Sequence, residues 1–149
     1  GVLGPLLEHA PGEVVVANRS IDKALALCER HASWARQHGS ALRASSLAEP
    51  GQSFDIVLNA SASSLAGSGV PVPDSVLRTD ALAVDLMYGP AAAGFLHWAR
   101  VRGARAQDGL GMLLEQAAEA FLLWRGMRPS TAPVLAALRA QLAAEAAAG

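Results

Sequence analysis

The stretch EVVVANRS, residues 13–20, decides the fold class of this chain. Its short β-branched run Val14–Ala17 carries no charge, which is typical of a strand buried on both faces of a parallel sheet. The run passes into a polar segment in which Ser20 stands at the position expected for a helix N-cap. Apolar residues then recur at helical spacing over residues 21–38, and Gly39 follows as a stop signal. The stretch therefore predicts a buried strand that leads directly into a helix.

The same alternation continues along the rest of the chain. We expect a weaker strand at 41–44, a stronger one at 54–60, and further strands at 81–86 and 104–106. We expect helices over 95–102, 112–125 and 131–148, with Gly126 and Pro129 just past the end of the second. Short apolar strands that alternate with helices predict an α/β fold with a Rossmann-like, doubly wound parallel sheet. No linker divides the pattern, so we expect one domain over residues 1–149.

Composition narrows the class of protein. Of the 149 residues 52% are hydrophobic and 17% charged, which is globular rather than disordered composition. A net charge of -1 gives no electrostatic case for nucleic acid or an anionic membrane. The longest uncharged run, 56–73, is interrupted by serines, glycines and prolines, so we expect no membrane span.

Two further observations concern location and metals. Cys28 is the one cysteine and cannot form an internal disulfide, and no signal peptide is visible, so we expect a reducing, cytoplasmic location. The four histidines are scattered without evident partners for acid/base work or metal binding.

A first candidate site follows the strand at 14–17. In doubly wound sheets the end of the second strand holds the adenosine ribose, where an acid selects NAD and an arginine accommodates the extra phosphate of NADP. Here the strand end offers the Arg19 guanidinium, the Ser20 hydroxyl and the Lys23 ammonium beside a helix N-terminus, which favours anions. The alternative is a capped surface helix with ordinary solvated charges.

A second candidate site lies where the strand at 81–86 ends. Ligands of open α/β sheets bind outside the carboxyl ends of the strands. The phenol of Tyr88 could hydrogen-bond a hydroxylated or carboxylated substrate there, although a half-buried tyrosine with its hydroxyl in water explains the residue equally. Asp85 could serve the site or act as a structural cap.

A third candidate site is the segment DGLGM, residues 108–112, with the helix that follows it. Glycines such as Gly109 at a helix start permit a ligand to approach the backbone closely. The amide of Gln116 interrupts an otherwise apolar stripe of this helix. A buried amide must be satisfied either by a bound polyol or by the protein itself, in which case it is a core glutamine.

Read in order, these segments resemble shikimate dehydrogenase over essentially the whole chain. NRSIDK at 18–23 resembles the family's NRTxxK phosphate motif, NAS at 59–61 its NATS loop, and DLMY at 85–88 its DMxY segment. The segment from Asp108 to Pro129 resembles the long and specific pattern DGxGMLxxQAAxAFxxWxGxxP. Departures are mild: Ser20 and Ser61 stand for threonine, and Leu86 stands where methionine is usual.

The resemblance implies an NADPH-dependent reduction of 3-dehydroshikimate to shikimate, a step of aromatic amino acid (chorismate) biosynthesis. It implies that Arg19, Ser20 and Lys23 hold the NADP phosphate and that Leu86 and Gly109 approach the nicotinamide. It also implies that Tyr88 and Gln116 face shikimate. The full set of implied cofactor-binding residues is Asn18, Arg19, Ser20, Lys23, Asn59, Ser61, Leu86 and Gly109.

The resemblance also implies parts that this chain does not contain. The family's glycine-rich diphosphate loop and first strand are expected upstream of Val2, and its catalytic lysine and aspartate lie in an N-terminal domain. We therefore assign no catalytic residue here and expect the chain alone to be inactive. The sequence leaves open whether the protein forms a homo-oligomer. The rival interpretations are a quinate/shikimate dehydrogenase that could use NAD, and a non-catalytic nucleotide-binding or regulatory module.

The absent first strand has a topological consequence. In the strand order 3-2-1-4-5-6 the first strand is central, so the predicted strands at 14–17 and 54–60 would flank a gap. Unpaired inner edges leave backbone groups unsatisfied. We expect a neighbouring chain or another segment to fill the gap, or the two strands to close up and pair directly.

Overall fold

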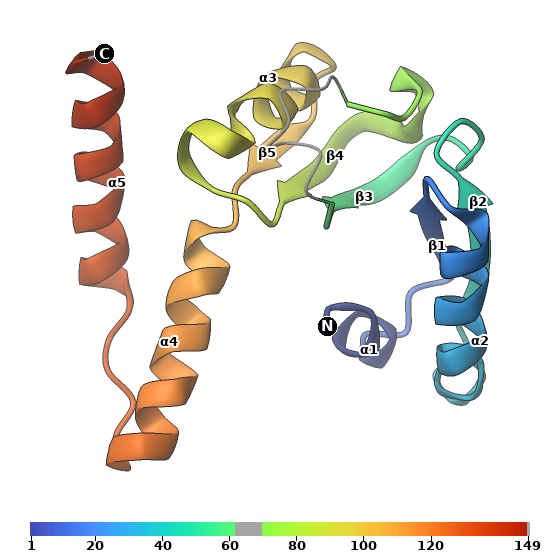
Figure 1. Ribbon diagram of the computed structural model, residues 1–149, viewed down its shortest axis with the longest axis horizontal. Coiled ribbons are helices and arrows are strands. Elements are labelled where there is room, and N and C mark those ends of the chain that lie inside the picture. The colour runs from blue at the N-terminus through green and yellow to red at the C-terminus, as the bar shows by residue number, and fades with distance from the viewer. Residues whose placement is uncertain (62–69, 149) are drawn as a thin grey trace. The chain divides into compact units, whose positions relative to one another are not determined.

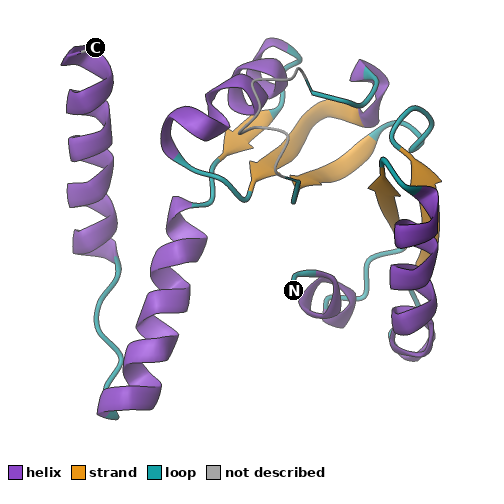
Figure 2. Ribbon diagram, in the orientation of Figure 1, coloured by secondary structure: helices purple, strands orange, loops and turns teal. Residues whose placement is uncertain are grey.

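A computed structural model describes residues 1–61 and 70–148 of the chain. The chain divides into two compact units, of which the first contains residues 1–52 and 71–76, and the second the described parts of residues 53–70 and 77–149. Helices alternate with parallel strands in the chain (Figures 1 and 2). The predicted α/β class with parallel sheets is therefore confirmed, whereas one domain over residues 1–149 stays a prediction.

The first unit is built on two parallel strands. These are β1 (Glu13–Asn18) and β2 (Ala41–Ser46), which pair from Glu13 opposite Ala41 to Asn18 opposite Ser46. Helix α2 (Ile21–Gln37) connects them, and Gly39 follows it with a φ of 71°, a conformation that glycine adopts without strain. The predicted strand and helix are confirmed, and the carboxyl ends of both strands lie at one edge.

A short helix that the sequence pattern did not indicate opens the unit. Helix α1 (Leu3–Glu8) contains Gly4 and Pro5, which obscure a helical pattern although a proline is tolerated in a first turn. It contributes two buried leucines to the core of the unit. That core joins Leu3 and Leu7 to Ala35 of α2, with Val14, Val16, Leu27 and Leu42 packed against them.

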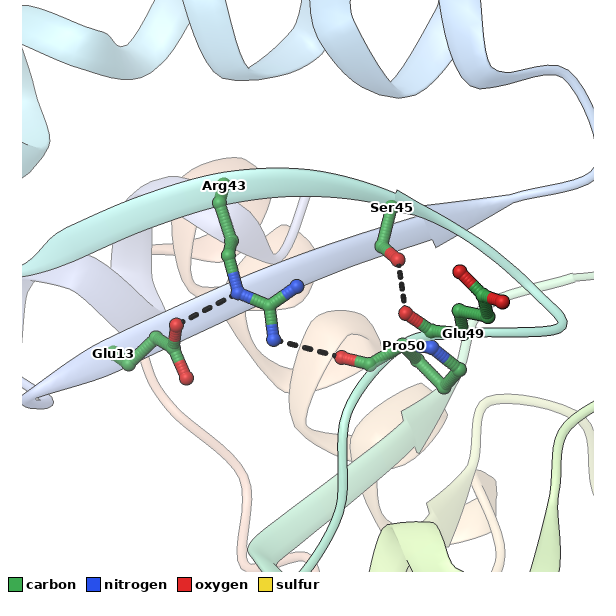
Figure 3. A network of polar contacts seen from close by, with 5 residues as sticks. All are labelled: Glu13, Arg43, Ser45, Glu49 and Pro50. Atoms are coloured by element: carbon green, nitrogen blue, oxygen red, sulfur yellow. Dashed lines mark hydrogen bonds and ion pairs between the residues drawn. The ribbon is translucent and has the colours of Figure 1, made fainter.

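A polar network fixes the turn after β2 (Figure 3). Arg43 donates from Nε to the Glu13 carboxylate at 2.8 Å and from Nη2 to the Pro50 carbonyl at 2.9 Å. The Ser45 hydroxyl donates to the Glu49 carbonyl at 2.6 Å. Since the Arg43–Glu13 pair is about half exposed (43% and 46%), it adds little stability, and the network chiefly orders the turn.

The second unit contains a three-stranded parallel sheet in the order β3-β4-β5. Its strands are β3 (Phe54–Asn59), β4 (Leu77–Asp85) and β5 (Arg105–Gln107), and its helices are α3 (Ala93–Val101), α4 (Leu110–Arg125) and α5 (Ala132–Ala148). Strand β4 begins at Leu77 rather than at the predicted Ala81. Phe95, Trp98 and Ala99 of α3 are buried, and α4 ends at Gly126 with a φ of 72°, as its position predicted.

Each unit has its own parallel sheet. Among the described residues the pairs are β1-β2 and β3-β4-β5, and β1 does not pair with β3. The expectation that these strands close up and pair directly is therefore wrong, and a filling strand from another chain or segment stays a prediction. Residues 14–17 are partly buried rather than buried, because β1 has a partner on one side only.

Two features of single elements complete the fold. In the described part of the chain, every helix is too short or too polar to cross a bilayer. Cys28 is buried on α2, and burial raises the pKa of its thiol.

Candidate functional site

The carboxyl end of β1 forms a tight polar turn into α2. The Asn18 side-chain oxygen accepts a hydrogen bond from the Ser20 N–H at 3.0 Å, and the Ser20 carbonyl accepts one from the Lys23 N–H at 3.2 Å. Ser20 is the N-cap residue in an extended conformation, as predicted, but its hydroxyl makes no capping bond. Asn18 therefore organises the turn, and the Ser20 hydroxyl is not used by the helix.

The cationic side chains at this turn are exposed. Within residues 1–61 and 70–148, neither Arg19 nor Lys23 forms an ion pair, and both side chains are exposed. The first N–H groups of α2 lie beside them, where an anion is favoured by unpaired donors and the helix dipole. Asp22 is the acidic residue of the first turn. A guanidinium, a hydroxyl, an ammonium and a helix N-terminus together suit a phosphate group.

The carboxyl ends of β3 and β4 are joined by a buried carboxylate. Asp85 is fully buried, and its Oδ2 accepts a hydrogen bond from Asn59 Nδ2 at 3.0 Å. Its Oδ1 accepts the Met87 N–H at 2.9 Å, while the Leu86 N–H donates to the Asn59 carbonyl at 3.0 Å. Asp85 therefore has the structural capping role that the sequence left open, and it shapes the turn that carries Leu86 and Tyr88.

Asn59 also fixes the start of the loop after β3. Its Oδ1 accepts hydrogen bonds from both the backbone N–H of Ser61 at 3.1 Å and the Ser61 hydroxyl at 2.7 Å. The two residues that the resemblance assigns to cofactor binding in this loop are thus held together at one strand end. Residues 62–69 lie outside the described residues.

Gly109 lies directly against the turn after β4. Its N–H donates to the Met87 carbonyl at 2.8 Å. A Cβ on Gly109 would stand 2.2 Å from the Leu86 carbonyl oxygen, far inside any tolerable contact. The close approach that the sequence suggested for a ligand is therefore made by the backbone of Leu86. The structure brings together the two residues that the resemblance places near the nicotinamide.

An ion pair at the start of α4 was not foreseen from the sequence. Asp108 is 6% exposed. Its carboxylate accepts hydrogen bonds from the two terminal nitrogens of Arg139 on α5, Nη1 at 2.7 Å and Nη2 at 2.5 Å. Its Oδ1 also accepts the Leu110 N–H at 3.2 Å. Burial raises the pKa of Asp108, but the hydrogen bonds and the charge of Arg139, with the Leu110 N–H, outweigh burial and lower this pKa below its usual value.

The two residues expected to face substrate are accessible. Tyr88 is 43% exposed and precedes the 3₁₀-helix Gly89–Ala92. Gln116 is exposed on α4, so the expectation of a buried amide is wrong for this chain, and so is the core-glutamine alternative. The reason is that no other element among residues 1–61 and 70–148 covers the Gln116 face of α4, where Leu113 is 42% exposed. Neither polar side chain is hydrogen-bonded within the described residues.

Metal ligation finds no support in the described part of the chain. Across residues 1–61 and 70–148, no group of three or more His, Cys, Asp or Glu side chains is placed to hold a metal ion.

Comparisons with known proteins identify shikimate dehydrogenases among the relatives of this chain. Residues 109–139 match the family model described as the shikimate 5'-dehydrogenase C-terminal domain. Over 140 residues the chain is 61% identical to the shikimate dehydrogenase (NADP(+)) of Methylibium petroleiphilum, a match that covers 94% of this chain and 48% of that protein. The chain thus spans about half the length of the curated relatives it matches.

Shikimate dehydrogenases are also among the solved structures that are similar to this chain. The shikimate 5-dehydrogenase of Thermus thermophilus in complex with NADP(H) and shikimate is 34% identical, with a TM-score of 0.70, and the match covers 92% of this chain and 49% of that one. A shikimate dehydrogenase in complex with NADP+ is 26% identical, with a TM-score of 0.74, over 95% of this chain and 50% of that one. The fold with two sheets and covering helices is therefore the Rossmann-like fold of these enzymes.

Proposed function

We propose that this chain, which belongs to the shikimate dehydrogenase family, is the NADP-binding part of an enzyme that reduces 3-dehydroshikimate to shikimate. The observation that carries the proposal is the turn at 18–23, where Arg19 and Lys23 are exposed and unpaired in the described chain beside the N-terminus of α2. Unpaired cations at that strand end suit the additional phosphate of NADP, and the residue directly after β1 is Arg19 rather than an acid. The names of the curated relatives support the same cofactor.

The chemistry is divided between the cofactor and the protein. When bound, NADPH supplies the hydride that converts the substrate carbonyl to an alcohol, and the new oxygen takes up a proton. The residues of this chain would bind the cofactor and the substrate and orient them. Arg19, the Ser20 hydroxyl and Lys23 would hold the phosphate, while Asn59 and Ser61 shape the loop after β3.

The second unit would serve the reacting end of the cofactor. Leu86 and Gly109, which are in direct backbone contact, would present a small, apolar surface to the nicotinamide. Tyr88 and Gln116, both exposed, would supply hydrogen bonds to the hydroxyl or carboxylate groups of the substrate. A polyhydroxylated acid suits a site in which a phenol and an amide have no hydrogen-bond partners among the described residues.

The rest of the parent protein completes the enzyme in this proposal. It supplies the acid/base group for the proton, so this chain alone has no turnover. The outer surface of α4 supports an additional partner segment, because Leu123 and Trp124 are 83% and 80% exposed and Phe121 is 39% exposed. Large apolar side chains gathered on one helix mark surfaces that another part of a protein covers.

The reducing cytoplasm suits the unpaired thiol of Cys28.

Calorimetric titration of the complete parent protein with NADP+, NAD+ and shikimate tests the proposal. We expect NADP+ to bind more tightly than NAD+, and shikimate to bind with the cofactor present. Tighter binding of NAD+ would instead favour a quinate/shikimate dehydrogenase. Nucleotide binding that shikimate never affects, together with an absence of shikimate binding, would favour a non-catalytic nucleotide-binding module.

A further inference from the structure

We infer that Arg139 is a positioning residue, which acts through Asp108 to hold the two loops of the substrate end, residues 86–89 and 108–110, in their working arrangement. The inference rests on the proposed function, because it concerns the loops that carry Leu86, Tyr88 and Gly109.

The Asp108 carboxylate is the point at which the two loops and α5 meet. Within its own loop it accepts the N–H of Leu110, and the backbone of Gly89 in the other loop helps to lower its pKa. From α5 it receives the two-pronged guanidinium of Arg139 at 2.7 and 2.5 Å. A two-pronged guanidinium–carboxylate pair fixes orientation as well as distance.

The two loops are also coupled directly. The Gly109 N–H donates to the Met87 carbonyl at 2.8 Å, and the Gly109 Cα lies so close to the Leu86 carbonyl that a side chain could not be accommodated. A displacement of Asp108 therefore moves Gly109, and the displacement passes to the backbone of Leu86 and Met87. Tyr88 follows in the same segment.

Helix α5 touches this region at a second point. A Cβ built on Gly89 would lie 3.6 Å from Cδ2 of Leu142, which is an ordinary packing distance. Leu142 follows Arg139 by one helical turn, so both residues lie on the same face of α5. The face of α5 that carries the ion pair thus also packs against the 86–89 loop, and α5 fixes both loops together.

The charge distribution makes Arg139 the decisive member of the pair. The Asp108 side chain is 5% exposed while that of Arg139 is 44% exposed, so the carboxylate depends on Arg139 for its counter-charge and the reverse dependence is weak. A buried carboxylate that loses its partner must protonate, admit water or move. Each response disturbs the hydrogen bond to the Leu110 N–H and the electrostatic interaction with the Gly89 backbone.

Arg128, in the segment between α4 and α5, offers a matched control. It pairs with Glu115 and Glu119 of α4, whose side chains are 53% and 60% exposed, so its loss leaves no buried charge. An arginine is removed from a carboxylate in both cases, but only Arg139 faces a buried one.

The test is steady-state kinetics of the complete parent enzyme as wild type, Arg139→Met, Arg139→Lys and Arg128→Met. Because small displacements of orienting groups cost large factors in rate, we expect Arg139→Met to raise the shikimate KM by about tenfold. The NADP KM of Arg139→Met should stay within about twofold of the wild-type value. The reason is that the phosphate contacts at Arg19 and Lys23 would not depend on the ion pair between Arg139 and Asp108. Lysine restores the charge without the planar fork of the guanidinium. The shikimate KM of Arg139→Lys should therefore lie between those of wild type and Arg139→Met.

The outcomes separate the inference from the proposed function. Kinetics of Arg139→Met equal to those of Arg128→Met, or equal increases in both KM values, would overturn the positioning role. If circular dichroism shows that Arg139→Met does not fold, Arg139→Lys decides: a wild-type shikimate KM overturns the inference, and a raised one with unchanged NADP KM supports it. An inactive wild-type enzyme would contradict the proposed function, and it would also contradict the inference that rests on it.

Discussion

Gly109 and Leu86 are in backbone contact so close that a Cβ on Gly109 would stand 2.2 Å from the Leu86 carbonyl oxygen. The φ of Gly109 is -78°, which any residue can adopt, so space rather than backbone conformation requires the glycine. The contact joins the carboxyl end of β4 to the start of α4. In the proposed enzyme these two segments would carry the nicotinamide end of the site.

Replacing Gly109 with alanine should therefore separate the two segments. We expect Gly109→Ala to lower the free energy of unfolding by about 1–3 kcal/mol, the usual cost of overpacking, and to raise the shikimate KM. Gly111→Ala is the matched control, because a Cβ there meets no atom within 4 Å. Urea unfolding of both variants measures the difference, and equal stabilities would contradict the close contact.

The exposed side chains of Tyr88 and Gln116 should contribute to substrate binding alone. We expect Tyr88→Phe and Gln116→Ala each to weaken shikimate use by about 0.5–1.5 kcal/mol, the worth of one hydrogen bond. NADP binding should not change, because both side chains would meet the substrate. Kinetics of the complete enzyme with each substrate varied in turn give both values. Unchanged shikimate kinetics in both variants would leave these residues without the proposed role.

The buried ion pair should make stability depend on pH. The pKa of Asp108 is lower in the folded protein than in the unfolded chain, so the folded state favours the carboxylate. Its contribution is therefore fully present above the unfolded pKa of about 3.9 and is lost as pH falls through the folded value. Asp108→Asn should destabilise the protein at pH 7 by about 1–2 kcal/mol.

The comparison of urea unfolding at pH 7 and at pH 3 tests this linkage. The gap in unfolding free energy between wild type and Asp108→Asn should narrow at pH 3, because this pH lies below the pKa of about 3.9 that the carboxyl has in the unfolded chain, so part of its stabilising contribution is lost. A gap of the same size at both values of pH would show that the charge of Asp108 does not stabilise the fold.

The elements that the sequence predicted well have local signals. The strand at 14–17 and the helix after it follow from a β-branched run, an N-cap position and a terminal glycine, and the structure has both as β1 and α2. Helix α1 lacked such a signal because Gly4 and Pro5 interrupt it, and its stability comes from the packing of Leu3 and Leu7.

The features that were missed depend on contacts between distant residues. Arg139 lies 31 residues from Asp108, so no spacing within a motif could reveal the pair. Gln116 was expected to be buried because it interrupts an apolar stripe, but burial needs a covering element, and none of the described elements covers the Gln116 face of α4. The partial burial of residues 14–17 has a similar cause, since a strand can be enclosed only when it has neighbours on both sides.

In the proposed enzyme the turn after β1 binds the additional phosphate of NADP, and a single ratio of kinetic constants measures this preference. This ratio is kcat/KM with NADP divided by kcat/KM with NAD, measured for the complete enzyme as wild type and as Arg19→Asp. Arg30→Asp, which makes the same change at an exposed position further along α2, is the control. An aspartate at the strand end repels the phosphate and can accept hydrogen bonds from a free ribose, so we expect the ratio to be well above one in wild type and Arg30→Asp and below one in Arg19→Asp. Equal ratios in wild type and Arg19→Asp would contradict the account.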